Sequence, residues 1–231
     1  MVNCMNFLFV GSREEDFIKL FELIKDNLVK EYNPGEINIQ YFDLAEHRHL
    51  ISNVRNSFAR TPFVKEYCSV GKAEFVQAFR NLRKVCDERY HAMQKVGIGP
   101  YEKYNKRMVE DGNPNKCFPK VIVILFGVEE LRAITNTPEY DEIIPNLRYI
   151  LKVGRTVGVS IGLGGYLPDY LFDRDMMCCI PMRIVLPCMK ETAECFLEGK
   201  ITDTQYQTSG IHTRMLWAGD IKHIDLEELE E

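Results

Sequence analysis

The residues with the clearest chemical potential lie near the start of the chain, where residues 7–18 read Phe-Leu-Phe-Val-Gly-Ser-Arg-Glu-Glu-Asp-Phe-Ile. The apolar run 7–10 is typical of a buried strand, Gly11 permits a tight turn, and a helix is expected to follow at once. A strand, turn and helix in this order present backbone N–H groups and a helix N-terminus, both of which bind phosphate. The layout is therefore that of a nucleotide-binding loop.

The side chains of this segment do not supply the matching chemistry. A phosphate-binding loop reads G-x-x-x-x-G-K-[ST], in which the lysine reaches the phosphates and the hydroxyl binds Mg²⁺. Counted from Gly11, the lysine position holds Phe17 and the hydroxyl position holds Ile18. An anionic ligand would also be repelled by neighbouring carboxylates, which belong to Glu14, Glu15 and Asp16.

A second interpretation explains the same residues without any ligand. Ser12 and Glu15 have the S-x-x-E spacing of a capping box, which would start an ordinary amphipathic helix at Arg13. We therefore expect a capped helix that does not hold ATP tightly. ATP and Mg²⁺ are conceivable ligands of the loop, but neither is an expected cofactor.

Length, composition and charge exclude several classes of protein. The 231 residues, 45% of them hydrophobic and 27% charged, are enough to bury the core of one α/β domain, so residues 1–231 are expected to form a single domain. The net charge is −5, which argues against a nucleic-acid surface. No apolar stretch reaches the roughly 18 residues of a membrane span, so we expect no direct membrane contact from this segment.

The cysteines and histidines do not have the spacing of metal ligands. No C-x-x-C pair occurs among the eight cysteines, and Cys178 and Cys179 are adjacent within an apolar run. This pattern favours a reducing compartment over a disulfide framework. The five histidines lack H-E-x-x-H spacing, so no metal site is predicted.

Strands and helices alternate along the chain, which predicts a doubly wound, mostly parallel sheet with helices on both faces. Strands are expected at 5–10, 37–42, 121–126, 159–163 and 182–186, and helices at 13–32, 72–96, 101–109 and 139–155. Residues 44–71 are expected to be irregular, and residues 215–217 to form a late edge strand. The unbroken apolar run 121–126 is expected at the centre of the sheet, with the strands at 5–10, 159–163 and 182–186 as its neighbours.

In the order of these elements, the whole chain resembles the motor domain of the FtsK/SpoIIIE family of P-loop ATPases. The resemblance implies an α/β fold of the P-loop NTPase (RecA/FtsK-like) type. Beyond the first loop, the segments that carry it are residues 36–43, ending in aspartate, 80–105 with Glu88-Arg89-Tyr90, 119–131, Gly154-Arg155-Thr156-Val157-Gly158, 163–168, and Ile180-Pro181-Met182-Arg183-Ile184.

The chain departs from this family at the positions that carry out catalysis. The family ends its second catalytic strand in Asp-Glu, which serves Mg²⁺ and the attacking water, whereas this chain has Phe126 and Gly127 there. Glu129 or Glu130 would take over only if the strand shifted by roughly 6–10 Å; otherwise they begin the next helix. The sensor position, where the family has an amide, holds Tyr166. No catalytic residue is therefore expected.

Two arginines, Arg155 and Arg183, match family positions. They are candidates for an interface with a neighbouring domain, where such arginines complete an adjacent active site. The alternative is a structural ion pair with an aspartate, which is common and individually weak.

Within the family, domains with degenerate nucleotide sites occur in the tandem ATPases of type VII secretion systems, EccC and EssC. The resemblance implies a non-hydrolysing module that docks secreted WXG-type substrate proteins and regulates adjacent ATPase domains of the same or a partner chain. It also implies a place in the cytoplasmic part of a membrane-anchored bacterial protein. The alternative is an active FtsK-like ATPase that translocates DNA or protein. A helix-in-groove dock is expected around residues 166–172, unless that loop packs on its own core.

Overall fold

A central sheet of eight strands organises the computed structural model, which describes residues 5–44, 64–69, 72–134, 136–166, 173–199, 201, 210–215 and 222–225. The strand order is β3-β2-β4-β5-β1-β6-β7-β8. The first six strands in this order run parallel, and β7 and β8 add to the β6 edge in antiparallel fashion. The strands are β1 (Phe7–Val10), β2 (Ile37–Asp43), β3 (Val64–Ser69), β4 (Lys120–Phe126), β5 (Val159–Gly165), β6 (Met182–Val185), β7 (Gly210–Met215) and β8 (Lys222–Asp225).

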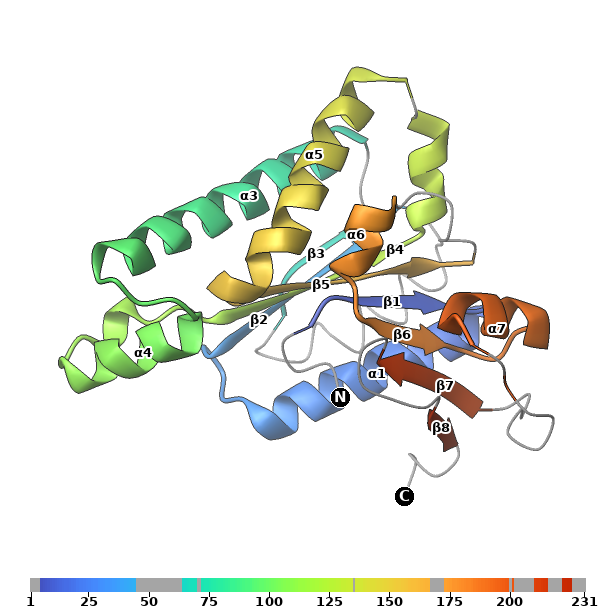
Figure 1. The fold of residues 1–231 in the computed structure, drawn as a ribbon, viewed down its shortest axis with the longest axis horizontal. Coiled ribbons are helices and arrows are strands. Elements are labelled where there is room, and N and C mark those ends of the chain that lie inside the picture. Colours follow the sequence, from blue (N-terminus) through green and yellow to red (C-terminus); the bar gives the residue numbers. More distant parts are fainter. Residues whose placement is uncertain are drawn as a thin grey trace.

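Helices cover both faces of this sheet, as the alternation of elements predicts. Helix α1 lies on one face, and α3 and α5 lie side by side on the other (Figure 1). The α-helices are α1 (Glu14–Glu31), α3 (Lys72–Lys95), α4 (Tyr101–Glu110), α5 (Pro138–Val153), α6 (Arg174–Cys178) and α7 (Lys190–Leu197). Three 3₁₀ segments accompany them: η1 (Pro114–Lys116), η2 (Val128–Ile134) and η3 (Gly154–Val157).

Strand β4 is buried on both faces along its whole length. Ile122, Ile124 and Phe126 pack into the core beneath α1, while Val123 and Leu125 pack into the core beneath α3 and α5. Because both faces of a covered parallel strand need apolar side chains, the unbroken apolar run is explained. The predicted interior position of this strand is confirmed.

The predicted neighbours of β4 are only partly correct. β4 pairs with β5, as expected for the strand at 159–163, but its other neighbour is β2. The strands β1 and β6 lie further along the sheet, where β1 pairs with β5 and β6. Apolar side chains on both faces indicate that a strand lies inside a sheet, but they do not identify the strands beside it. The predicted neighbours of β4 were partly wrong for this reason.

Two further expectations about strands are wrong. Part of the segment 44–71, expected to be irregular, forms β3 next to β2. Its sequence, Val-Lys-Glu-Tyr-Cys-Ser, has neither an apolar run nor strict alternation, and it lies at the end of the strand order, where one-sided pairing is enough. The late strand is β7, which ends at Met215 and is covered by β8 rather than lying at the edge. Residues 216–217 lie outside the described residues.

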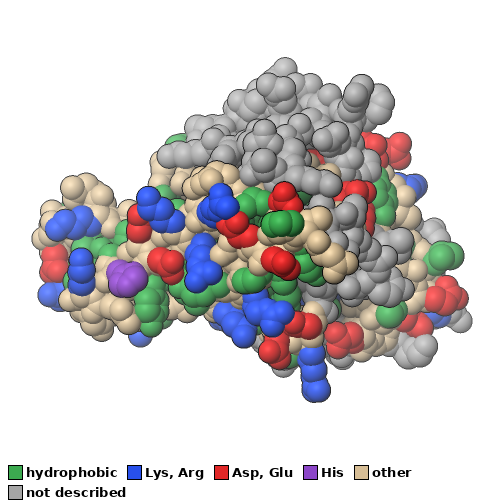
Figure 2. All heavy atoms as spheres, turned by 90° about the horizontal axis from the view of Figure 1, so that it is seen from above, with side chains coloured by type: hydrophobic (Ala, Val, Ile, Leu, Met, Phe, Trp, Pro, Cys, Tyr) green, Lys and Arg blue, Asp and Glu red, His purple; other side chains and the backbone are tan. Residues whose placement is uncertain are grey.

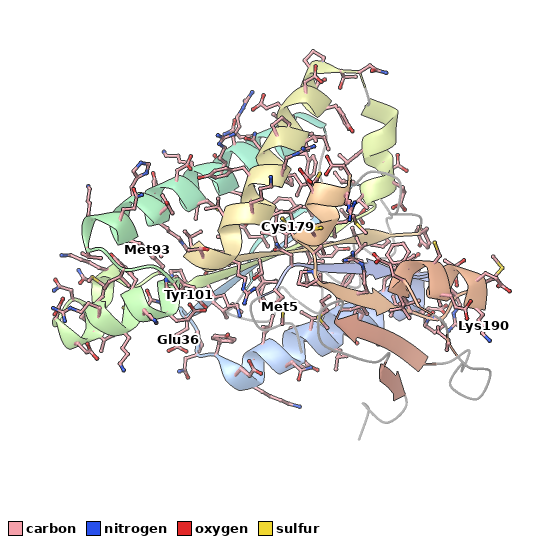
Figure 3. The ribbon with its side chains drawn as sticks, viewed as in Figure 1. Met5, Glu36, Met93, Tyr101, Cys179 and Lys190 are labelled. Atoms are coloured by element: carbon pink, nitrogen blue, oxygen red, sulfur yellow. The ribbon has the colours of Figure 1, made fainter. Side chains whose placement is uncertain are left out.

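The parallel strands all begin at one side of the sheet, the amino edge, and all end at the opposite side, the carboxyl edge. Glu36 precedes β2 and marks the amino edge, and Lys190 begins α7 after β6 and marks the carboxyl edge; Figure 3 shows them at opposite ends of the molecule. Buried Asn6 fixes β1 between these edges. Its side-chain amide donates to the carbonyl oxygens of Leu151 and Cys179, each at 3.0 Å, and accepts from the backbone of Ile161.

The close pairing of β1 with β5 leaves no room for a side chain at position 162. A Cβ there would overlap the ring of Phe7 on β1, so we expect Gly162→Ala to lower the free energy of unfolding by about 1–3 kcal/mol through overpacking. Gly99→Ala is the matched control, because a Cβ at Gly99 meets nothing within 4 Å, and its effect should stay within about 0.5 kcal/mol. Urea unfolding followed by circular dichroism measures both, and equal losses would contradict this packing.

Candidate functional site

The residues singled out in the sequence come together at the carboxyl edge of three adjacent strands. Gly11 follows β1, Gly127 follows β4 and Tyr166 follows β5, and the strand order places β4, β5 and β1 side by side. In open α/β sheets, ligands bind outside the carboxyl ends of the strands. This edge is therefore where a nucleotide-binding site would be.

The turn at this edge is short and its interior is filled. β1 ends at Val10 and α1 begins at Glu14, so the helix starts before the position at which the phosphate-binding motif has its lysine. A Cβ on Gly11 would lie 2.9 Å from Cβ of Leu186 and 3.0 Å from Cζ of Phe17. The side chains of Leu186, just after β6, and of Phe17 on α1 thus occupy the space beside the glycine.

The predicted capping box does not form. Ser12 donates its hydroxyl to the carbonyl oxygen of Pro187 at 2.8 Å, which ties the turn to the segment after β6. Arg13 is the N-cap residue of α1 and makes no side-chain capping bond, and Glu15 is exposed. The sequence pattern missed the competing acceptor because Pro187 is distant in sequence.

The first turn of α1 is acidic and internally paired. Asp16 is buried and accepts two hydrogen bonds from the Arg13 guanidinium, at 2.8 and 3.0 Å. The hydrogen bond with Asp16 raises the pKa of Arg13. One carboxylate oxygen of Glu14 is buried and has no hydrogen-bond partner. Carboxylates at a helix N-terminus suit the helix dipole, so this turn already carries the kind of negative charge that a phosphate would otherwise bring.

Three aromatic rings come together at the positions that the sequence resemblance predicts for the lysine, the metal-binding carboxylate and the sensor amide of a P-loop ATPase. Phe17 lies 4.8 Å from Phe126 and 5.3 Å from Tyr166 between ring centroids, and Phe126 lies 5.7 Å from Tyr166. All three pairs meet edge to face, the arrangement that aromatic quadrupoles favour. Phe17 and Phe126 have no exposed surface, and Ile18 packs against the same core. We call Phe17, Phe126 and Tyr166 the aromatic triad.

One of the two glutamates after β4 reaches the site without a shift of the strand. β4 stays in register through Phe126, and Glu129 and Glu130 fall in η2. One oxygen of Glu129 accepts a hydrogen bond from the backbone of Tyr166 at 3.1 Å. The other is buried without a hydrogen-bond partner and lies against Gly165, where a Cβ would overlap it. Glu130 is exposed.

The electrostatic surroundings of Tyr166 are acidic. Burial raises the pKa of its phenol, and the carboxylates of Glu14, Glu129 and Asp43 raise it further. Asp43 is fully buried at the end of β2, and sequence reasoning noted this aspartate without placing it in the site. Asp43 was not placed in the site because the sequence did not show that β2 pairs directly with β4. A ligand at this edge would therefore meet rings and carboxylates.

The two candidate interface arginines lie away from the aromatic triad. Arg183 on β6 has no exposed surface; it donates to the carbonyl oxygen of Ile180, lies 3.7 Å from Glu198, and burial lowers its pKa. Arg155 is exposed on η3, just before β5 and hence at the amino edge of the sheet. Of the expected dock at 166–172, only Tyr166 lies within the described residues.

The part of the chain that the structure describes offers neither a cluster of metal ligands nor a membrane span. No group of three or more histidines, cysteines or acids is placed there to hold a metal ion. None of the helices described combines the length and apolarity needed to cross a bilayer.

Solved structures share this fold at low sequence identity. The cytoplasmic domain of the type VII secretion ATPase EccC from Thermomonospora curvata matches 95% of this chain with a TM-score of 0.72 and 14% identity, over 25% of its own length. The pCW3 conjugation coupling protein TcpA, in its monomer form with ATPγS, matches 99% with a TM-score of 0.71 and 13% identity, over 66% of its length. EssC (ATPases 2 and 3) from Geobacillus thermodenitrificans matches 99% with a TM-score of 0.70 and 14% identity, over 42% of its length.

EccC (ATPases 2 and 3) has also been solved with a signal sequence peptide, and it matches 91% of this chain with a TM-score of 0.58 and 11% identity, over 34% of its length. The sequence itself matches no protein-family model and no curated protein. The chain thus spans about a quarter of the EccC structure. What it shares with EccC, EssC and TcpA is the P-loop NTPase fold.

The aromatic triad should contribute strongly to stability. Phe17→Ala removes a fully buried ring that contacts both other members, so we expect it to lower the free energy of unfolding by about 3–5 kcal/mol. Ile18→Ala, one position along and only partly buried, is the control and should cost clearly less. Chemical denaturation measures both variants. A loss below that of the control would show that Phe17 is not a core residue.

The surroundings of Tyr166 predict a specific alkaline behaviour. Because folding raises the pKa of this phenol, the stability that it contributes is complete below pH about 10 and is lost as the pH rises through the raised value. The difference between the ultraviolet titrations of the native chain and Tyr166→Phe should therefore show a phenol that ionises above its ordinary range. A difference titration centred at or below pH about 10 would contradict the assigned surroundings.

Proposed function

We propose that this chain is a non-hydrolysing ATPase-like module of a type VII secretion tandem ATPase, which docks secreted WXG-type substrates and regulates neighbouring ATPase domains. In this proposal the module belongs to the cytoplasmic part of a membrane-anchored bacterial protein. Its partners are the adjacent ATPase domains, in the same chain or in another, and the secreted proteins that it docks.

The aromatic triad carries the proposal. Phosphoryl transfer needs a lysine on the phosphates, carboxylates on Mg²⁺ and a group that positions the nucleophile, all at once. The sequence resemblance assigns Phe17, Phe126 and Tyr166 to those positions, and their rings contact each other. The residues beside Gly11 do not fit a nucleoside triphosphate either, since Leu186 and Phe17 fill that space. In this proposal the chain therefore takes no part in ATP hydrolysis.

The likeness to secretion ATPases supports the rest of the proposal. The fold of this chain accounts for only part of each EccC or EssC structure, as expected for one domain of a tandem protein. EccC has been solved with a signal sequence peptide, and this supports peptide docking as the retained activity of a module that has lost hydrolysis. The regulatory role rests on the proposed place in a tandem protein, where a domain that adjoins an active one would contribute to its interface.

One observation favours a second function, that of an active FtsK-like translocase of DNA or protein. Glu129 brings a buried carboxylate oxygen without a hydrogen-bond partner to the carboxyl edge, next to Gly165. A carboxylate there could serve Mg²⁺ or an attacking water. The absence of any lysine at the position of Phe17 makes this the weaker of the two functions.

Titration with a fluorescent ATP analogue and Mg²⁺ separates the two functions. We expect no binding tighter than the millimolar range, about −4 kcal/mol, because rings and carboxylates meet the phosphates. Phosphate release should equal that of a buffer blank. Turnover above the blank that disappears in Glu129→Gln, but persists in the exposed control Glu130→Gln, would replace the proposed function with the translocase.

A further inference from the structure

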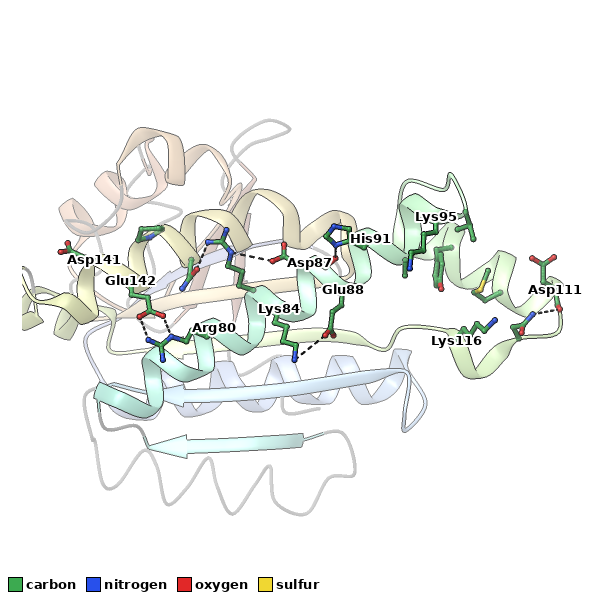
Figure 4. A pocket seen from close by; sticks show the side chains of 18 residues that line it. Arg80, Lys84, Asp87, Glu88, His91, Lys95, Asp111, Lys116, Asp141 and Glu142 are labelled. Carbon is green, nitrogen blue, oxygen red and sulfur yellow. Dashed lines mark hydrogen bonds and ion pairs between the residues drawn. The ribbon is translucent and has the colours of Figure 1, made fainter.

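A long groove runs along the outer side of α3, on the face of the sheet opposite α1. It has a volume of about 1310 Å³, and α5 forms its wall at one end while α4 and η1 form it at the other (Figure 4). Seen from that side, Lys and Arg side chains alternate with Asp and Glu, with hydrophobic side chains between them (Figure 2). None of its lining residues belongs to the aromatic triad.

At the α5 end of this groove the charges are already paired. Arg80 forms a two-point ion pair with Glu142 on α5. Arg83 donates to the side chain of Asn146 at 3.0 Å, and Lys84 lies 3.8 Å from Glu88 on its own helix. This end offers little net charge to a ligand.

The α4 end differs because its lysines lack acidic partners. Lys95 closes α3 and Lys116 belongs to η1, and Figure 4 shows both at the end of the groove away from Arg80. Both are exposed, and neither forms an ion pair with any residue that the structure describes. The nearby Asp111 is held by Arg107 at 2.9 Å. This end therefore presents two uncompensated positive charges.

Apolar side chains line this end of the groove as well. Ala92 from α3 is half-buried, Val96 just after α3 is 45% exposed, and Met108 from α4 is buried at 6% exposure. We call Lys95, Lys116 and these three residues the basic groove end. Its chemistry suits a short segment that combines aliphatic side chains with carboxylates.

The chain itself carries such a segment after β8. Residues 226–231 read Leu-Glu-Glu-Leu-Glu-Glu. Leucines three residues apart share one face of a helix, and glutamates occupy the other positions. This acidic segment complements the basic groove end in both charge and apolar character.

The acidic segment cannot reach the basic groove end of its own molecule. Its six residues span at most about 20 Å when extended. The strand order β4-β5-β1-β6-β7-β8 separates β8 from β4 by five strand spacings, about 24 Å. β8 also ends at the carboxyl edge, because β6, β7 and β8 alternate in direction, whereas Lys116 precedes the amino end of β4.

We propose that the acidic segment of one copy of this chain docks in the basic groove end of a second copy. The two surfaces differ, so the contact is heterologous and joins copies head to tail. Glutamates of the segment pair with Lys95 and Lys116, and its leucines cover the exposed side chain of Val96 and the half-buried side chain of Ala92. This inference is independent of whether the chain binds ATP.

A labelled peptide of residues 222–231, followed by fluorescence anisotropy, tests the docking. The native chain should bind it, and Lys95→Glu/Lys116→Glu should weaken binding about tenfold or more, since two attractive contacts become repulsive. Lys30→Glu/Lys103→Glu changes the net charge equally at exposed lysines outside the groove and should bind normally. A peptide with serine at both leucine positions should bind more weakly than the native peptide.

Light scattering of the whole chain gives the second readout. The native chain should associate as its concentration rises, and a chain ending at Asp225 should remain monomeric, as should Lys95→Glu/Lys116→Glu. Circular dichroism confirms that these variants are folded. The proposal is overturned if the peptide fails to bind the native chain, if both double variants bind it equally, or if removal of residues 226–231 leaves association unchanged.

Discussion

The mutual packing of Phe17, Phe126 and Tyr166 is the contact on which the interpretation of this molecule depends. It joins the first turn of α1 to the ends of β4 and β5. The same edge of a P-loop sheet normally keeps polar groups and space for phosphate. Here Phe17 and Phe126 hold the helix against the strands, so this part of the carboxyl edge belongs to the hydrophobic core. Aromatic pairs add about 0.5–1.5 kcal/mol each beyond the area they bury, which makes this a stable alternative to a ligand.

The charges around the rings, like the rings themselves, disfavour an anionic ligand at this edge. Arg13 is engaged by Asp16, and the groups that raise the pKa of Tyr166 through their charge are all carboxylates. A nucleotide site works the opposite way, with cations and N–H donors gathered around an anion. In this chain, the fold that is shared with EccC, EssC and TcpA therefore presents aromatic rings and carboxylates at this edge. Activities that need only the scaffold, such as docking of a peptide or contact with a neighbouring domain, remain compatible with it.

Local patterns in the sequence predicted much of this structure, and the failures have physical causes. The apolar run of β4 and the stripe of α1 identified an interior strand and an amphipathic helix, since burial on two faces or on one leaves a direct record in the sequence. Contacts between residues far apart in the sequence leave no such pattern. The partner of Ser12 is Pro187, and the neighbour of β4 is β2. The candidate positions were identified from motif spacing, but only the structure brings Phe17, Phe126 and Tyr166 into contact and adds Asp43 to their surroundings.

Nuclear magnetic resonance of the aromatic rings shows whether Phe17, Phe126 and Tyr166 pack against each other in solution. With Phe17 and Tyr166 assigned by substitution, the account predicts strong cross-relaxation among the three rings of the triad in solution. It further predicts that their chemical shifts do not change when ATP and Mg²⁺ are added at millimolar concentration, because the rings already occupy the phosphate position. Saturable shifts of these rings, together with loss of the contacts between them, would show that a nucleotide displaces the triad and would contradict the account.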